Sequence, residues 1–270
     1  IGTFHSLGVQ ILKSEANLVG RTSPFTIFDE DDSLSLVKKI LAGLNLSKDR
    51  FNPLAMMVQI SRIKNGLSKE DSLPSGSHYE KIAFSVFKKY EEALQSSNAF
   101  DFDDLIEKVV RIFQNHPEIL EKYQNRWQNI LVDEFQDVNT GQYLLIKLLA
   151  QKHRSLFVIG DDAQSIYAFR GSDFRNFLNF EKDWLGAEII KLEENYLYTQ
   201  NIIRAASELI KNNKFQKPKD LWTKNSAGDL IQLFAFQNGE EEARGITEKI
   251  SELLKNNEPI GEIAILYRTN

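Results

Sequence analysis

The sequence predicts an α/β fold, and two short apolar runs with a helical pattern between them carry that prediction. Ile130–Val132 runs into the acidic stretch Asp133–Asp137, and Leu156–Ile159 runs into Gly160–Asp162. Apolar runs this short, without polar alternation, are typical of strands buried on both faces of a parallel sheet. A helical pattern over Gly141–Lys152 separates the two runs, so strand, helix and strand form a βαβ unit.

Both acidic stretches should lie at one edge of this sheet, because the carboxyl ends of parallel strands meet there. Open α/β sheets bind their ligands at that edge. Adjacent carboxylates suit two tasks, which are holding Mg²⁺ on a nucleotide and activating water. The alternative is that each strand becomes polar only because it meets solvent. The recurrence of an acidic end at the second strand favours the functional interpretation.

Composition narrows the class of protein further. The chain has 270 residues, of which 42% are hydrophobic and 26% charged, enough for one large or two modest globular domains. It has no cysteine, which excludes disulfides and thiolate metal sites and fits a cytoplasmic protein. Its four scattered histidines argue against a transition-metal cluster, and no apolar run reaches membrane-spanning length. The net charge of −5 excludes a generally basic surface but allows a local positive groove for nucleic acid.

The residues before the first buried run are mostly helical in pattern. Apolar residues at helical spacing predict a helix within residues 2–19, with Thr3 or Ser6 as its cap. We expect residues 20–97 to form a helical subdomain that contains the loop-like stretch 67–78. The elements predicted within it are an extended piece at Phe25–Phe28 and helices at 34–43, 54–64 and 79–96.

The rest of the chain alternates between strand and helix patterns. Helices open at Asp101–Leu105 and at Pro117, before the first buried strand. A second α/β unit is predicted beyond a join near residues 183–190. Its elements are candidate strands at Ile189–Leu192, Leu230–Phe236 and Ile263–Tyr267 and helices at 199–212 and 240–254. Because the chain starts at Ile1 and ends at Asn270 directly after a predicted strand, we interpret it as a fragment.

Several motifs resemble those of superfamily 1A DNA helicases, the UvrD/Rep/PcrA group. Asp133–Asp137 resembles the Walker B motif of that family. The other matching segments are Gly160–Gly171 (motif III), Leu192–Tyr196 (motif IV), Thr3–Ser6 and Phe102–Leu105 (signatures near DNA) and Ile263–Asn270 (the strand before the 2B insertion). The order and the spacings agree with the family along essentially the whole chain. A lone Asp-Glu pair would be weak support, whereas five ordered motifs are specific.

The resemblance implies a RecA-like P-loop NTPase fold. Residues 1–19 and 98–188 would form domain 1A, with the Walker B motif and motif III in the second of these segments. Residues 20–97 would be the helical 1B insertion, and residues 189–270 would begin a second RecA-like domain, 2A. The resemblance also implies ATP and Mg²⁺ as cofactors.

The same resemblance gives roles to three residues of the acidic edge. Asp133 would hold Mg²⁺, and Glu134 would orient and deprotonate the attacking water. Gln164 would sense the γ-phosphate of ATP. A solvated strand end is the alternative for both carboxylates, and a helix-capping or surface amide is the alternative for Gln164.

Aromatic residues provide candidates for binding nucleic acid and nucleotide. Tyr167 and Phe169 would stack on bases of single-stranded DNA, with Arg170 beside them or in contact with the nucleotide. Tyr196 matches the motif IV tyrosine that stacks on adenine. Core packing is the alternative for Tyr167 and Phe169.

At the start of the chain, Thr3, His5 and Ser6 resemble residues that contact the DNA phosphate backbone. Helix capping is their alternative role. Asp103 and Asp104 are expected to be helix-start acids, which would repel a phosphate backbone unless they hold a basic neighbour in place.

The sequence departs from the family in two respects. Leu197 stands where motif IV usually has an arginine that reaches the γ-phosphate, and leucine cannot stabilise developing phosphoryl charge. No Gly-x-x-x-x-Gly-Lys-Ser/Thr loop occurs in the chain, and in the family that loop would precede Ile1. We therefore expect the fragment alone to be inactive.

The function predicted for the parent protein is an ATP-dependent 3′-to-5′ DNA helicase. It would move along single-stranded DNA and unwind duplex junctions in DNA repair or replication. The alternatives are the helicase part of a helicase–nuclease and a catalytically weakened member that binds DNA or a protein partner. An unrelated Mg²⁺ phosphohydrolase that uses two acidic strand ends is a further alternative, which the aromatic residues of motif III oppose.

Overall fold

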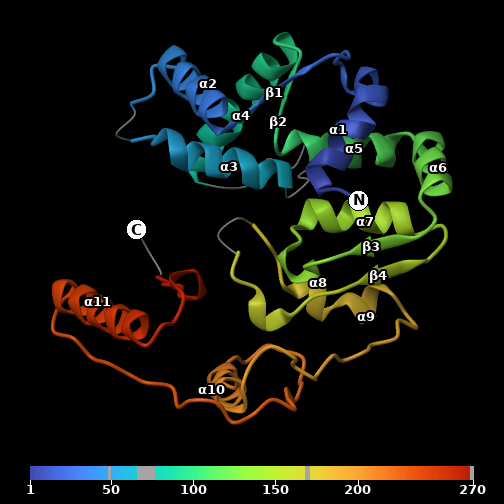
Figure 1. Cartoon of the computed structure of the whole chain (residues 1–270). Helices are drawn as coiled ribbons and strands as arrows, with labels where there is room; N and C mark the ends of the chain where they lie inside the picture. The colour runs from blue at the N-terminus through green and yellow to red at the C-terminus, as the bar shows by residue number, and fades with distance from the viewer. Residues whose placement is uncertain (48–49, 66–76, 168–170, 268–270) are drawn as a thin grey trace. The chain divides into compact units, whose positions relative to one another are not determined.

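The computed structural model contains two compact units (Figure 1). Unit 1 comprises residues 1–190 and 213–218, and unit 2 comprises residues 191–212 and 219–270. The structure describes residues 1–47, 50–65, 77–167 and 171–267. The predicted loop 67–78 therefore lies almost entirely outside the described residues. None of the described helices is both long enough and apolar enough to cross a membrane.

Unit 1 combines helices with two small parallel sheets. Its described helices are α1 (Phe4–Glu15), α2 (Glu30–Gly43), α3 (Pro53–Asn65), α4 (His78–Ser96), α5 (Asp104–Asn115), α6 (Pro117–Arg126), α7 (Thr140–Ala150), α8 (Arg175–Leu178) and α9 (Phe180–Asp183). Its described strands are β1 (Thr26–Phe28), β2 (Ala99–Asp101), β3 (Ile130–Val132) and β4 (Leu156–Val158). The short 3-10 helices are η1 (Ala16–Val19), η2 (Phe135–Asp137) and η3 (Asp162–Gln164). The predicted α/β class is confirmed for this unit.

Helices α1, α5, α6 and α7 form one hydrophobic core. Leu12 from α1, Val109 from α5 and Leu145 from α7 are each fully buried in it. Helix α5 is buried along most of its length, because it packs against α1 on one side and α7 on another. Phe4 and Leu7, at the start of α1, pack against this core. The core therefore holds the first turn of α1 in place.

Helices α2, α3 and α4 form a second core, around Val37, Met56 and Val86. The chain enters α2 through Asp29 and α4 through Ser77, and each of these residues forms a capping box with the acid three residues later. Capping boxes satisfy backbone amides that the helix itself leaves unpaired. The predicted bounds of α3 and α4 are confirmed to within one residue, and the predicted end of α2 is confirmed, but α2 begins at Glu30, four residues before its predicted start.

The strands pair in parallel, two by two. Thr26–Phe28 pairs with Ala99–Asp101, and Ile130–Val132 pairs with Leu156–Val158. The first pair corrects the prediction for residue 101, which ends a strand; the helix begins at Asp104. The second pair confirms the predicted parallel strands, and α7 lies along them (Figure 1).

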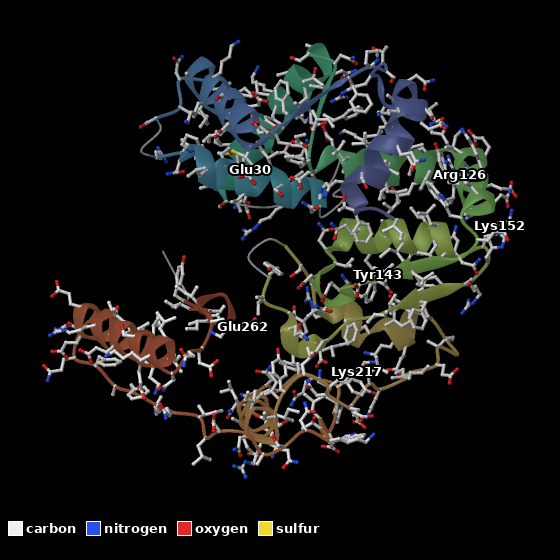
Figure 2. All side chains as sticks on the ribbon, in the orientation of Figure 1. Glu30, Arg126, Tyr143, Lys152, Lys217 and Glu262 are labelled. Atoms are coloured by element: carbon white, nitrogen blue, oxygen red, sulfur yellow. The ribbon has the colours of Figure 1, made fainter. Side chains whose placement is uncertain are left out.

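Aromatic side chains close the end of the β3–β4 sheet. Phe135 is fully buried, and its ring lies 5.6 Å from that of Tyr143 and 5.5 Å from that of Phe180. Tyr143, labelled in Figure 2, donates its hydroxyl to Asp183 at 2.6 Å. These contacts fix the turn that follows β3 against α7 and α9.

The prediction that this sheet is buried on both faces is wrong for the described part of the chain. Val132 faces the core, but Leu131 is 74% exposed and Phe157 is 53% exposed. Successive side chains of a strand point to opposite faces. Helix α7 covers one face, and no described element covers the other.

Unit 2 contains helix α10 (Gln200–Ile210), helix α11 (Gly239–Lys255) and the 3-10 helix η5 (Ile260–Glu262). Both predicted helices are confirmed. The predicted strands Ile189–Leu192, Leu230–Phe236 and Ile263–Tyr267 are wrong, because the structure gives all three runs as irregular chain. Strands need backbone partners, and a single bridge between Glu194 and Trp222 is the β pairing in the described part of this unit.

Candidate functional site

The ends of β3 and β4 lie side by side and carry the candidate catalytic groups. Val132 pairs with Val158, and the amide of Ile159 donates to the Val132 carbonyl at 2.9 Å. The amide of Phe135 then donates to the Ile159 carbonyl, also at 2.9 Å. The prediction that the two acidic stretches share one edge of a sheet is therefore confirmed.

Asp133 and Glu134 follow β3 directly, and both are exposed. The amide of Glu134 donates to Asp133 Oδ1 at 2.9 Å. Glu134 has φ of 49°, in the left-handed region, which costs a residue with a Cβ about 1–2 kcal/mol. Strain of this kind gathers at functional sites, where it fixes the direction of a side chain. Burial, together with the charge of Glu134, raises the pKa of Asp137.

Gln136 joins the two strand ends. It is 1% exposed; its Nε2 donates to Glu134 Oε2 at 2.7 Å, and its Oε1 accepts from the amide of Asp161 at 2.9 Å. The sequence prediction gave no role to this residue. Its position inside the acidic stretch was the available signal, because a carboxamide can donate to a carboxylate.

The turn after β4 continues this set of hydrogen bonds. Asp161 Oδ1 accepts from the amide of Ala163 at 2.9 Å, so Asp161 caps this turn. Asp161 Oδ2 accepts from Gln164 Nε2 at 3.0 Å. Gln164 is thus brought into the same hydrogen-bonded group as Glu134.

The remaining nucleotide and DNA candidates are only partly described. Tyr167 is 39% exposed, whereas Phe169 and Arg170 lie outside the described residues. Tyr196 is in unit 2, is 76% exposed and donates its hydroxyl to Glu194 Oε2 at 3.1 Å. That hydrogen bond raises the pKa of Tyr196. The exposure of Tyr167 opposes core packing, which was its alternative role.

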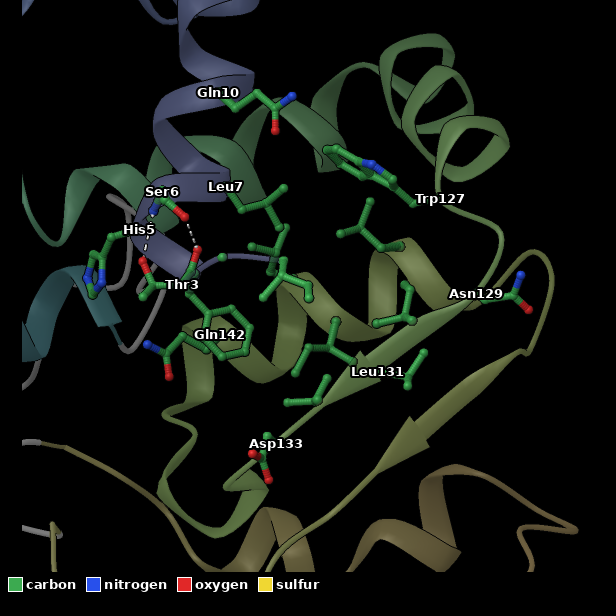
Figure 3. Close-up of a pocket in the computed structure, with 18 residues that line it drawn as sticks. Thr3, His5, Ser6, Leu7, Gln10, Trp127, Asn129, Leu131, Asp133 and Gln142 are labelled. Carbon is green, nitrogen blue, oxygen red and sulfur yellow. Dashed lines mark hydrogen bonds between the residues drawn. The ribbon is translucent and has the colours of Figure 1, made fainter.

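Helix α1 opens at the predicted cap. The amide of Ser6 donates to Thr3 Oγ1 at 3.2 Å, and the Ser6 hydroxyl donates to the Thr3 carbonyl at 2.8 Å. Figure 3 shows these residues with His5 on the lining of a pocket of about 590 Å³ that also includes Asp133. The first turn of α1 and the end of β3 therefore border one cavity.

His5 is half-buried at the start of α1. Its ring lies 5.9 Å from that of Phe102, edge to face. Burial lowers the pKa of His5, and Asp103 opposes that shift. This shift favours the neutral imidazole, which suits a hydrogen-bond contact better than an ionic one.

A buried lysine pairs with the acids at the start of α5. Lys64 Nζ lies 2.8 Å from Asp101 Oδ2 and 2.8 Å from Asp104 Oδ1, and 2.7 Å from Glu91 Oε1. Asp101 also accepts from the Tyr90 hydroxyl at 2.9 Å. Of the two acids predicted at this helix start, Asp104 holds a basic neighbour, Lys64, whereas Asp103 accepts a hydrogen bond from the Asn65 side-chain amide.

Burial opposes charge throughout this cluster; mutual attraction overcomes it for Lys64 and Glu91, whereas burial raises the pKa of Asp104. The three acids raise the pKa of Lys64 well above its usual range, against the effect of its burial. Burial likewise opposes the charge of Glu91, yet Lys64 and Lys108 lower its pKa to about 2. Buried pairs of this kind fix the relative positions of elements, because removing one partner leaves a buried charge uncompensated.

The next residue, Asn65, connects the helical segment to the acidic edge. Asn65 Nδ2 donates to Asp103 Oδ1 at 2.9 Å, and Asn65 Oδ1 accepts from Asn139 Nδ2 at 3.1 Å. Asn139 in turn caps α7, with Gln142 completing its capping box. The sequence prediction missed Lys64 and Asn65, because both act through partners more than thirty residues away.

Two protein-family models match this chain. The model described as the UvrD/REP helicase N-terminal domain matches residues 1–184, and the model described as the UvrD-like helicase C-terminal domain matches residues 190–270. The first match alone covers more than half of the chain.

Individual relatives agree with the family models. The chain is 43% identical over 272 residues to the ATP-dependent DNA helicase PcrA of Staphylococcus epidermidis. It is 42% identical over 273 residues to PcrA of Bacillus subtilis and 42% identical over 272 residues to PcrA of Staphylococcus aureus. Each alignment covers 100% of this chain and 37% of the relative.

Proposed function

Because the chain belongs to the UvrD/REP helicase family, we propose that it forms part of an ATP-dependent 3′-to-5′ DNA helicase. The protein would couple ATP hydrolysis to movement on single-stranded DNA and to unwinding at duplex junctions, in DNA repair or replication. The chain spans 37% of the length of the curated relatives it matches, so the proposal concerns the longer protein to which it corresponds.

The observation that carries the proposal is the hydrogen-bonded group at the ends of β3 and β4. Phosphoryl transfer to water needs positioning and charge stabilisation more than covalent chemistry. Glu134 would orient the attacking water and accept its proton, and Gln164 would contact the γ-phosphate. Both side chains come from turns that the parallel pairing of the strands holds together.

The residues present fit a hydrated Mg²⁺ ion. Among the described residues, no three potential ligands converge, and Mg²⁺ on a nucleotide typically takes only one or two protein carboxylates beside water and phosphate. Asp133 offers such a carboxylate, exposed at the end of β3 with Oδ1 accepting one backbone hydrogen bond. The ion would neutralise charge on the phosphates, and Asp133 would hold it in place.

The proposed domain layout follows the RecA-like helicases. Residues 1–19 and 98–188 would form domain 1A, residues 20–97 the 1B insertion and residues 189–270 the first part of domain 2A. The change of family model between residues 184 and 190 supports the boundary before domain 2A. The separate core of α2, α3 and α4 supports the insertion.

Residues at the start of α1 and in motifs III and IV would contact DNA and the adenine base of ATP. Thr3, His5 and Ser6 would bind backbone phosphates at the start of α1, where amides and hydroxyls suit anions. Tyr167 and Phe169 would stack on bases, and the exposure of Tyr167 supports this role. Tyr196 would stack on adenine, with Arg170 as a further nucleotide contact.

The second candidate function is a weakened family member that binds DNA without efficient turnover. Leu197 favours it, because it is 81% exposed and carries no charge where the family has an arginine. A helicase–nuclease is a longer variant of the first candidate.

Substitution of Glu134 by glutamine in the full-length protein distinguishes an ATP-hydrolysing helicase from a family member that only binds DNA. We expect DNA-stimulated ATP hydrolysis to fall at least a hundredfold while binding of a fluorescent ATP analogue persists, because the amide cannot accept the proton. A wild-type protein that binds DNA but does not hydrolyse ATP would establish the binding module. Equal hydrolysis by both proteins would exclude Glu134 as the base.

A further inference from the structure

Gln136 is the buried polar residue of the acidic edge that the proposed function leaves without a role. We propose that Gln136 is a positioning residue that couples the orientation of Glu134 to that of Gln164. This inference deepens the proposed ATPase function and rests on it. It predicts that a change at either end of the chain of hydrogen bonds is transmitted to the other end.

The chemistry of its neighbours fixes which way the Gln136 amide points. An ionised carboxylate can only accept, so Nε2 must face Glu134 Oε2, which lies at 2.7 Å. A backbone amide can only donate, so Oε1 must face the Asp161 nitrogen at 2.9 Å. Rotation of the amide by half a turn would place donor against donor and acceptor against acceptor. The side chain therefore has one productive orientation.

Packing holds Gln136 in that orientation. The side chain is 1% exposed, and it lies against Gly160, the residue before Asp161. A Cβ at position 160 would lie 2.6 Å from Gln136 Oε1 and 2.9 Å from Cε2 of Phe177. Glycine at this position therefore allows the strand end to approach the amide closely. Because Gln136 has so little room, a movement of Glu134 would be passed through its side chain to Asp161, and the reverse.

The chain of hydrogen bonds continues from Gln136 to Gln164 without a gap. The Asp161 carboxylate accepts from the amide of Ala163 at 2.9 Å and from Gln164 Nε2 at 3.0 Å. Glu134 and Gln164 are exposed, Asp161 is half-buried, and Gln136 in the middle of the link is buried. Turning either exposed end toward a ligand breaks or stretches a hydrogen bond of the link. Residues joined by one such network are energetically coupled.

Replacement of Gln136 by methionine in the full-length protein tests the coupling. Methionine keeps the approximate volume but makes neither hydrogen bond. We expect kcat for ATP hydrolysis to fall roughly ten- to a hundredfold, because misplacement of a catalytic group by about 1 Å has that effect. KM for ATP should change less than about threefold, because the residue does not contact the nucleotide.

Gln124→Met is the matched control. Gln124 is also buried, and its Nε2 donates to the Leu148 carbonyl at 2.7 Å, away from the strand ends. This variant loses a buried hydrogen bond of the same type, so stability should fall while kcat stays within about twofold of the wild type. An equal fall of kcat in both variants would mean that Gln136 matters only for folding and would overturn the proposal.

A double-mutant cycle with Gln164→Met tests the transmission itself. If the two glutamines act through one network, kcat of the double variant should lie within about threefold of the worse single variant. Independent residues would give the product of the two single effects, and that result would overturn the coupling.

Nuclear magnetic resonance on this chain gives a readout that needs no ATP hydrolysis. In Gln136→Met, the backbone amide of Asp161 should exchange with solvent at least tenfold faster, and the side-chain amide signals of Gln164 should shift. Neither change should occur in Gln124→Met. Unchanged Asp161 and Gln164 signals would overturn the proposal. A wild-type full-length protein without ATPase activity would overturn only the proposed function, because the spectra still report on the link.

Discussion

Units 1 and 2 differ in how they use apolar residues. Unit 1 buries its large side chains in three clusters, each formed by residues from several helices or strands. In the described part of unit 2, Ile203 is the one buried apolar side chain, while Leu233 is 96% exposed and Leu266 is 94% exposed. Burial of apolar surface is the main favourable term in folding. We therefore expect the tertiary stability of this chain to reside in unit 1.

Charged groups differ between the units in the same way. Lys64 is fully buried among three acids in unit 1, whereas Lys249 of α11 in unit 2 pairs with Glu252 at 2.9 Å with both side chains exposed. Exposed pairs contribute little to stability. Breaking a buried pair leaves a charge without compensation. The contrast gives three predictions of decreasing size.

The largest effect should come from Lys64→Met. It removes the cation that Asp101 and Asp104 share in the interior, while Lys108 still pairs with Glu91. The free energy of unfolding of unit 1 should therefore fall by about 3–5 kcal/mol. Lys249→Met should change it by less than about 0.5 kcal/mol. Urea unfolding of this chain, followed by circular dichroism, measures both. A loss below about 1 kcal/mol for Lys64→Met would mean that the cluster does not stabilise unit 1.

Acid should affect unit 1 through Glu91. Its pKa is lowered from 4.5 to about 2, so its contribution to stability is fully present above about pH 4.5 and is lost as the pH falls toward 2. The loss should amount to roughly 2–3 kcal/mol. Hydrogen exchange, read separately for the two units between pH 5 and 3, should show the decline in unit 1.

Glu91→Gln should flatten that pH dependence, because the glutamine side chain does not titrate. Glu92, the next residue of α4, is exposed and provides the control, so Glu92→Gln should leave the slope unchanged. The same slope in the wild type and in Glu91→Gln would assign the acid sensitivity to other carboxylates.

The smallest effect should be similar in the two units. Asp29 caps α2 in unit 1 and Asn238 caps α11 in unit 2, each by accepting a backbone amide. Replacement of either by alanine should cost its helix about 1 kcal/mol. Urea unfolding reports the loss for α2, and residue-level hydrogen exchange reports it for α11. A much larger loss for Asn238→Ala would show that α11 depends on tertiary contacts that its exposed surface does not suggest.

Elements set by local chemistry were predictable from the sequence. Asn52 caps α3 by accepting from the amide of Leu54 at 2.9 Å, and Pro53 opens that helix. Neither needs a distant partner, and the predicted start of the helix is confirmed. Strands β3 and β4 were also predictable, because Val132 and Val158 pair with each other within the chain.

What depends on distant partners was predicted poorly. Leu230–Phe236 has the alternation of apolar and polar residues that is typical of a strand, but the structure gives it as irregular chain. Alternation indicates which side chains a strand would bury, but not whether a neighbouring strand is present to pair with it. A lysine at the end of a helix, such as Lys64, is expected to be solvated. Its burial and ion pairing depend on Asp101 and Asp104, which lie far along the chain. Gln136 likewise becomes meaningful only through Asp161. Phe169 and Arg170 lie outside the described residues, so their predicted roles stay predictions.

The left-handed backbone of Glu134 has an evolutionary consequence. Its φ of 49° suits glycine best, so Glu134→Gly would relax the turn by about 1 kcal/mol or more while removing the carboxylate. Selection for stability alone would favour glycine over glutamate at this position. The proposed role of Glu134 in orienting the attacking water would give a chemical reason for a glutamate at a position that costs stability.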